Sequence, residues 1–521
     1  MKNNLTTRIK SFFPYIFLIF LGVLFLITRV WRVTTIPCGV HVDEAGMAYD
    51  AWCLSQYGTD RYLNSYPLYL INFGGGQSAL YAYLTAFLFH FFGFKMIFLR
   101  LPSILFSLLT VIFGMLIIRH IFPNRKALPI LGGYLITISP IFILMARIGM
   151  DCHLMLGAST VFLYFFIQAI NSDKYLYYVL SGITGGIILY TYALSYIVLP
   201  LFLLLSFLYV LSIKKFSLRK WLSMGIPLGL IASPLIAIQF INLLDLPEMY
   251  LGPFTLTKLP GYRVDELGGF NFASFRNIIV TIFTGDMWSH NSISGIPNLY
   301  WIAIPFVVIG IIHCIFRLIL SIRQKNLDPK VFCLIWFICI IYTMSHIWPC
   351  LTQLNSIFFV MIVFIIDAWS IIFPISNKLC DFVLKSALGI IYVTCFLSFA
   401  IYYYNGQYTI DNYPSGYFSI LQTDAITFID SNPSYGKKGV QTAVPTVVYA
   451  LSSLKSPYEL GISLESSFLE NGYVHCSYLG SIEDGYYYIV NDSFPDYIVE
   501  LKDKGFSEIN YGHYSLFYKK Q

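Results

Sequence analysis

The chain has 521 residues, of which 57% are hydrophobic and only 12% are charged. Soluble domains carry about 25% charged residues, so this composition excludes an ordinary soluble enzyme and a disordered protein. The net charge of +6 is unevenly divided: residues 405–521 carry 13 acidic and 7 basic side chains, and the preceding residues carry 14 acidic and 26 basic ones. The basic excess of the larger part favours membrane topology over nucleic-acid binding.

Repeated apolar runs predict an all-α polytopic membrane protein with about eleven spans. The first span, over 12–28, follows a basic N-terminus without a small-residue cleavage site and is predicted to be retained. A polar segment, 31–77, comes next. The short aromatic run 79–94 is interpreted as an interfacial helix, because this choice leaves the basic clusters cytoplasmic. Further spans are predicted near 101–118, 128–146, 154–170, 176–192, 196–213, 221–243, 298–316, 331–347, 352–373 and 386–404.

The last part of the chain has a different pattern. Residues 405–521 contain short alternating stretches separated by turn signals such as Asn432-Pro433 and Asp484-Gly485. We expect a transmembrane domain over 1–404 and a small α/β domain over 405–521. The N-terminus is predicted to be cytoplasmic and the C-terminal domain extracytoplasmic. No cysteine or histidine spacing indicates a metal site.

The segment after the first span holds the most informative polar residues. Asp43 and Glu44 are adjacent carboxylates directly beyond a membrane helix, and such a carboxylate is suited to act as a general base for an acceptor hydroxyl. A solvated loop in which Asp43 caps a helix is the alternative. Asp60 and Gln77 lie in the same segment and are predicted to contact substrate.

Three later polar groups are also predicted to face outward. Arg147, Asp151 and His153 follow the 128–146 span, where an arginine can bind a lipid phosphate, although an Arg–Asp surface pair explains them equally well. The second group lies in an aromatic-rich loop, where an interfacial aromatic belt is the simpler alternative. The third lies at the end of a late span. The predicted substrate-binding residues of these last two groups are His290, Asn291, Gln353 and Asn355, with His346 and Trp348 beside the last pair.

These features resemble the GT-C fold glycosyltransferases that use polyprenyl-phosphate-linked sugars, and in particular bacterial members of the protein-mannosyltransferase-like and aminoarabinose-transferase-like group. The resemblance covers roughly residues 10–360. It is carried by the stretches HVDEAGMAYDAWCLSQYGTDRYLNSYPLY, FGGGQSALYAYL, RLPS, ARIGMDCH and LYTYALSY.

The resemblance implies that Asp43 deprotonates the acceptor and that Glu44 positions it. It implies phosphate or acceptor contacts for Arg147 and Asp151. Relatives often carry a donor-binding arginine near the end of a late span, where this chain has Gln353, so Arg147 or Arg263 is expected to compensate. The implied partners are a polyprenyl-phosphate sugar, membrane lipids and an extracytoplasmic glycan, lipid or protein. No nucleic acid partner and no cofactor is expected, and a divalent cation is left open.

The expected reaction is an inverting sugar transfer at the outer face of a bacterial plasma membrane. A lipid-linked-sugar transporter or flippase, or a non-catalytic envelope-assembly protein, is the alternative. Transporters usually carry charges in mid-membrane and show internal repeats. Asp367 is the only acidic residue placed within a predicted span here, and the outer loops are long, which favours an enzyme.

Overall fold

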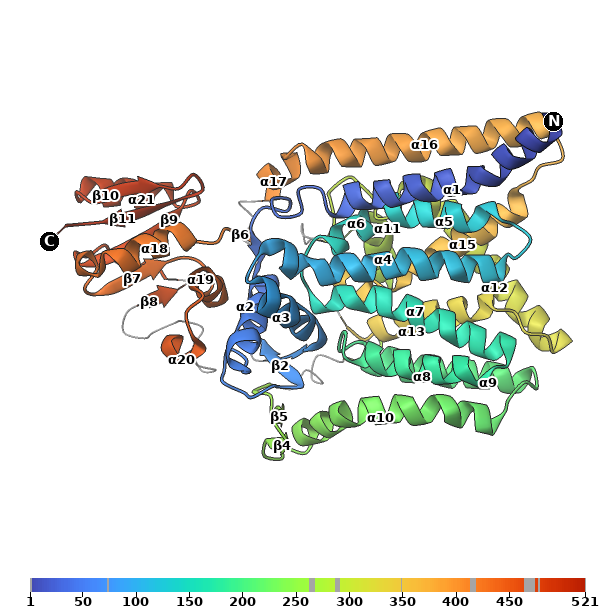
Figure 1. Cartoon of the computed structure of the whole chain (residues 1–521), viewed down its shortest axis with the longest axis horizontal. Coiled ribbons are helices and arrows are strands. Elements are labelled where there is room, and N and C mark those ends of the chain that lie inside the picture. Colours follow the sequence, from blue (N-terminus) through green and yellow to red (C-terminus); the bar gives the residue numbers. More distant parts are fainter. Residues whose placement is uncertain are drawn as a thin grey trace.

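The computed structural model describes residues 2–72, 75–261, 268–285, 291–347, 349–412, 418–462, 474–476 and 478–520, and the side chains from residue 15 onward except those of 410 and 412. The structure consists of a helical bundle, a short loop region and a C-terminal sheet domain. Figure 1 shows the loop region lying between the other two, at one end of the bundle. This end is called the domain end below.

The helices of the bundle occupy the predicted span positions. They are α1 (Lys2–Arg29), α4 (Met96–Ile121), α5 (Ala127–Ile138), α6 (Pro140–Ala146), α7 (Asp151–Ser172), α8 (Tyr175–Leu189), α9 (Ser195–Ser212), α10 (Leu218–Leu243), α12 (Ile304–Gln324), α13 (Lys330–Met344), α15 (Ile357–Ile372) and α16 (Lys378–Tyr404).

Within the described residues, 6 of these helical segments are long and apolar enough to cross a membrane alone, and α5 with α6 makes a seventh span bent by 61°. The bend falls where Ser139 is extended before Pro140, because the proline ring disfavours helical geometry in the residue before it. The other predicted spans correspond to shorter apolar helices. The chain is thus a multi-pass membrane protein.

The loop region after α1 contains β1 (Val40–His41), α2 (Val42–Tyr57), the hairpin β2 (Tyr69–Asn72) and β3 (Gly75–Ser78), and α3 (Leu80–Phe92). The aromatic helix α3 packs along α2, where an interfacial helix was expected. Helix α2 ends at Tyr57 and is capped by Gly58, whose φ of +69° is left-handed and where a Cβ would lie 2.6 Å from the Tyr66 hydroxyl oxygen.

The connection between α10 and α12 holds β4 (Met249–Leu251), β5 (Phe254–Leu256), α11 (Phe272–Thr284) and a 3-10 turn, Trp301–Ala303. The short helix α14 (Leu351–Leu354) precedes α15. Strands β4 and β5 form a two-stranded hairpin.

The C-terminal domain follows α16 and the short helix α17 (Gln407–Asn412). Its mixed sheet has the order β10 (Ser507–Asn510), β11 (Tyr514–Tyr518), β9 (Tyr486–Asn491), β7 (Gly439–Thr442) and β8 (Val474–Cys476), with β7 parallel to both β8 and β9. The remaining elements are α18 (Thr423–Ser431), a 3-10 turn at Pro433–Tyr435, α19 (Thr446–Ser453), α20 (Pro457–Leu460) and α21 (Pro495–Asp503).

The C-terminal domain is joined to the loop region by backbone and side chains. Strand β6 (Phe418–Ser419) pairs antiparallel with β1, directly before α2. Gly39 permits this approach, because a Cβ there would lie 2.4 Å from the carbonyl oxygen of Ser419. One apolar core runs from α2 and α3 into α18, α19 and the five-stranded sheet. The domain is therefore built onto the helix that carries the predicted catalytic pair.

Candidate active site

The Asp43–Glu44 pair lies in the first turn of α2. His41 caps this helix. Its ring Nδ1 accepts a hydrogen bond from the Asp43 backbone N–H at 3.2 Å, and the His41 backbone N–H donates to Glu44 Oε2 at 3.3 Å. The helix N-terminus favours negative charge at both positions. The expected cap is present, but His41 provides it rather than Asp43.

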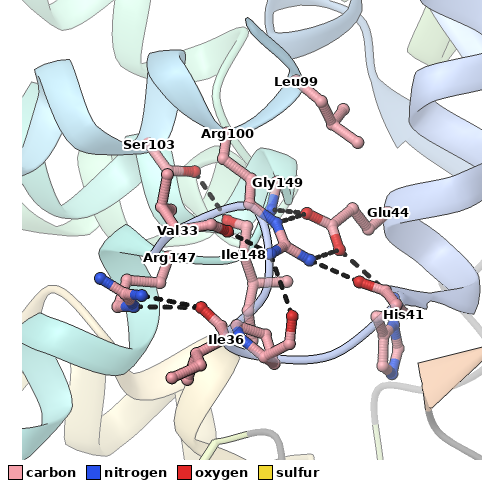
Figure 2. A network of polar contacts seen from close by, with 12 residues as sticks. Val33, Ile36, His41, Glu44, Leu99, Arg100, Ser103, Arg147, Ile148 and Gly149 are labelled. Atoms are coloured by element: carbon pink, nitrogen blue, oxygen red, sulfur yellow. Dashed lines mark hydrogen bonds and ion pairs between the residues drawn. The ribbon is translucent and has the colours of Figure 1, made fainter. Parts of the chain in front are cut away.

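Glu44 is fully buried in a network of hydrogen bonds (Figure 2). Its two oxygens accept from Arg100 Nε at 2.8 Å and Arg100 Nη2 at 3.0 Å, and the Gly149 N–H donates to Oε1 at 2.8 Å. Arg100, on α4, also donates to the carbonyls of Val33 and Gly39. Glu44 therefore ties α2 to α4 and to the segment before α7, which agrees with a positioning role.

Arg147 is also fully buried, and its guanidinium donates hydrogen bonds to backbone carbonyls (Figure 2). It donates to Thr28 at 3.1 Å, Trp31 at 3.0 Å and Ile36 at 2.9 Å. The rings of Tyr403 and Tyr404 lie within 5.5 Å of it. Arg147 thus joins α1, the following turn and α16, and it does not line the cavity of about 460 Å³ that opens beside the N-terminus of α2. Its predicted phosphate contact stays a prediction.

A cavity of about 460 Å³ opens beside the N-terminus of α2, a size typical of small-molecule sites. Asp43, Gln77, Asp151 and Gln353 line it, so four residues predicted from distant parts of the sequence meet there. The walls also contain other polar, aromatic and apolar side chains, among them Asn72, Tyr69, Tyr192, Tyr196, Gln239, Leu259, Ile347 and Thr352.

Asp43 is held at the edge of this cavity with its side chain 39% exposed. Asn72 donates from Nδ2 to Asp43 Oδ1 at 3.2 Å, and His41 Nδ1 lies 3.6 Å from Oδ2. Burial lowers the pKa of His41, which agrees with a neutral ring accepting from the Asp43 N–H. Asp43 is oriented by neighbours and still reaches the cavity, as a general base must.

Asp151 begins α7 and lines the same cavity as Asp43. Its carboxylate accepts from the Ser78 N–H at 3.2 Å and from the Cys152 N–H at 2.8 Å. Gln77, the neighbour of Ser78 on β3, is buried, and no described residue donates to its side-chain oxygen. Strand β3 and helix α7 are thereby joined at the cavity wall.

The other predicted residues that the structure describes do not line the cavity. Asp60 accepts hydrogen bonds from Tyr62 and Asn64 inside its own turn, and burial raises the pKa of Asp60 to about 7, with Asp50 adding to the effect. His153 contacts the Ile148 carbonyl, and Asn355 donates to the Cys152 carbonyl. Asn291 is buried.

His290, Arg263 and Trp348 lie outside the described residues, and His346 contacts the Gly268 carbonyl. Two residues that hold the predicted pair were not predicted as site residues. Arg100 lies in the RLPS stretch, which contributed only to the resemblance, and Asn72 reaches Asp43 only because the β2–β3 hairpin folds back over α2.

The described residues contain no group of three or more His, Cys, Asp or Glu that is close enough to hold a metal ion. Asp43 and Asp151 are the carboxylates that line the described cavity, so a divalent cation there would be bound through them.

A family model described as dolichyl-phosphate-mannose-protein mannosyltransferase matches residues 77–238, which include Gln77 and Asp151. ArnT from Cupriavidus metallidurans bound to undecaprenyl phosphate is similar over 97% of this chain and 98% of its own, with a TM-score of 0.57 and 13% identity. The chain has an ArnT-like GT-C fold.

The apo state of ArnT is similar with a TM-score of 0.53 and 13% identity, over 98% of each chain. No curated protein matches the chain by sequence. The ArnT similarity includes the C-terminal domain as well as the bundle, because it extends over nearly the whole of both chains. Family model and fold together support a membrane glycosyltransferase.

Proposed function

We propose that the protein transfers a sugar from a polyprenyl-phosphate donor to an extracytoplasmic cell-envelope glycan, lipid or protein, with Asp43 as the general base. The observation that carries the proposal is the different environment of the two adjacent carboxylates. Both oxygens of Glu44 accept hydrogen bonds from Arg100 or the Gly149 N–H, whereas Asp43 faces a cavity. In this proposal Glu44 holds α2 in place, and Asp43 is available to accept a proton.

The donor class follows from the fold and the family model. The ArnT structure was obtained with undecaprenyl phosphate, and the family model is described by a dolichyl-phosphate sugar. A lipid-phosphate donor carries its own leaving group, so no nucleotide is required on the outer side. We place the N-terminus in the cytoplasm and the cavity on the outer side of a bacterial plasma membrane, as the distribution of basic residues favours.

The proposed step is an inverting displacement. The acceptor oxygen forms a bond to the anomeric carbon while the bond from that carbon to the phosphate oxygen breaks. The acceptor proton moves to Asp43, and the polyprenyl phosphate leaves with the electron pair. Asn72 holds one Asp43 oxygen, which leaves the other oriented for the acceptor.

A transporter would use charges within the membrane to carry an ion or substrate. Asp367 on α15 is fully buried, but Lys330 Nζ lies 2.7 Å from its Oδ1, and His313 Nδ1 lies 2.5 Å from its Oδ2. This charge is compensated inside the bundle, which favours the enzyme over the transporter.

The test is Asp43→Asn in a membrane assay with a labelled polyprenyl-phosphate sugar. We expect transfer to fall by about 10²–10⁴-fold, the usual contribution of a general base, with unchanged folded yield. Asp492→Asn, at an exposed position in the C-terminal domain, is the matched control and should keep full activity. Normal transfer by Asp43→Asn would remove Asp43 from this role. Full activity in the presence of a chelator would argue against a required divalent cation.

A further inference from the structure

The β4–β5 hairpin exposes a cluster of apolar side chains. All three residues of β4 are exposed, Tyr250 by 69%, and Phe254 at the start of β5 is a fourth exposed apolar residue. The Phe254 ring contacts the half-exposed ring of Tyr66 from the first loop, with the two ring centroids 6.2 Å apart. Exposed apolar side chains gathered in this way mark a surface that contacts a partner protein or a membrane.

The hairpin adjoins a surface that faces lipid. Helix α10 is a membrane span, and the most exposed side chains near its domain end are apolar: Ile236, Phe240, Leu243 and Leu244. Residues 244–248 connect this end of α10 directly to β4. Figure 1 shows the hairpin beside the same end of α10, on the flank of the bundle. The apolar side chains of the hairpin therefore extend the lipid-facing surface of α10 rather than starting a separate one.

The length of α10 places the hairpin at the level of the lipid headgroups. The helix has 26 residues and is about 39 Å long, whereas the hydrocarbon core of a bilayer is about 30 Å thick. Arg219 and Lys220 lie in its first turn and mark one membrane surface. Its other end therefore reaches the opposite headgroup region, where the amphipathic ring of a tyrosine such as Tyr250 is favoured.

The backbone and the charges of the hairpin fit the boundary between headgroups and acyl chains. In the part of the chain that the structure describes, β4 pairs with β5 alone and its other edge is open. An open apolar edge promotes aggregation in water, and unpaired backbone groups are excluded from the hydrocarbon core, so the boundary suits both. Residues 244–257 include Asp245 and Glu248 but no lysine or arginine. Contact with lipid would thus depend on apolar insertion and not on anionic headgroups.

The hairpin is also bonded to the wall of the candidate active site. The Thr257 hydroxyl, just after β5, donates to the Tyr69 carbonyl at 2.7 Å. Asn242 on α10 donates to the Thr257 carbonyl at 3.1 Å and accepts from the Leu259 N–H at 2.7 Å. Tyr69 and Leu259 both line the cavity. The segment that leaves the hairpin therefore forms part of the cavity wall.

We propose that the β4–β5 hairpin inserts its apolar side chains into the lipid leaflet at the domain end, and that this anchor holds the mouth of the cavity at the membrane surface. The occupant of the apolar face is membrane lipid. The anchoring itself is independent of the reaction. Its effect on the cavity rests on the proposed function, because a lipid-linked donor presents its sugar at the level of the headgroups.

The first experiment measures lipid contact. The photoreactive p-benzoylphenylalanine is placed at position 250 of the full-length protein in phosphatidylcholine vesicles, and the adduct formed on irradiation is identified by intact mass. We expect a lipid adduct in a yield similar to that at Phe240 on α10, with none at Val499, an exposed residue of the C-terminal domain. Admixture of phosphatidylglycerol should leave the yield unchanged.

Two results of this experiment would overturn the inference. One is the absence of a lipid adduct at position 250 when position 240 gives one. The other is a covalent dimer formed at position 250, which would assign the apolar face to a second copy of the chain.

The second experiment tests the link to the cavity. Tyr250→Ser combined with Leu251→Ser removes apolar side chains from the exposed strand, which should lower the fraction of protein with an anchored hairpin. Because apparent affinity falls with the competent fraction, KM for the lipid-linked sugar should rise about tenfold with kcat nearly unchanged. Val499→Ser is the matched control and should keep the original KM.

The outcomes of the second experiment separate the two proposals. An unchanged KM in the folded double variant would overturn the link between hairpin and cavity. Absence of transfer by the unmodified protein would contradict the proposed function and leave the lipid contact as measured by the first experiment.

Discussion

The domain end of the molecule contains two polar regions: a buried network whose charged groups are paired inside the protein, and a cavity wall whose polar groups are open to a ligand. In the buried network, Glu44, Arg100 and Arg147 are fully enclosed, and their charged groups are bound to protein partners. In the cavity wall, Asp43 is partly exposed, and no described residue donates a hydrogen bond to the side-chain oxygen of Gln77. The comparison shows that two adjacent carboxylates can have different environments. Successive side chains on a helix point in directions about 100° apart, so Glu44 enters the buried network while Asp43 reaches the cavity.

The largest effect is expected when the buried network loses its central cation. Arg100→Met leaves the Glu44 carboxylate buried without a counter-charge, a change that usually costs about 3–5 kcal/mol of folding stability. Thermal unfolding in detergent and the yield of monodisperse protein measure the loss. The double variant Glu44→Leu with Arg100→Met should recover stability, because both charges are then absent, but should remain poorly active. A stable, inactive Arg100→Met would instead assign Arg100 to catalysis.

A smaller loss of stability is expected from Arg147→Lys. This variant tests whether Arg147 belongs to the buried network or also contacts the lipid phosphate. A lysine ammonium lacks the planar fork that reaches the carbonyls of Thr28, Trp31 and Ile36 together. Stability should fall by about 1.5–3 kcal/mol, the range for hydrogen bonds to a charged group. The folded fraction should bind polyprenyl phosphate as the unmodified protein does. Weakened binding with unchanged stability would support the phosphate contact predicted from sequence.

The smallest effect concerns Asp60, a buried carboxyl outside both regions. Its pKa of about 7 in the folded protein lies above the value of about 3.9 expected when unfolded. The folded state therefore binds the Asp60 proton more tightly than the unfolded state does. The protonated carboxyl contributes stability that is fully present below about pH 4 and is lost as the pH rises through about 7. Asp60→Asn should remove that decline, so the difference in Tm between variant and unmodified protein should shift in favour of the variant from pH 5 to pH 8. A pH-independent difference would contradict this.

The sequence allowed prediction of the fold class because span positions depend on local hydropathy. It also led to four cavity residues, Asp43, Gln77, Asp151 and Gln353, since polar groups beside apolar runs are few. It did not reveal how Glu44 is held, because Arg100 lies far along the chain and the contact depends on helix packing. The enclosure of Arg147 was hidden for a similar reason: its partners are backbone carbonyls, which leave no mark on side-chain identity.

The pairing of β1 with β6 has a consequence for assembly. The residues just before α2 find their strand partner only near the start of the last domain. Phe418 of that strand packs in one apolar cluster with Ile148, Met150 and Cys152, and the last two line the cavity. A nascent chain that has inserted its helices still lacks this support. The cavity beside Asp43 therefore gains this support only after synthesis has passed Ser419, so products truncated before β6 lack the strand partner of Val40 and His41.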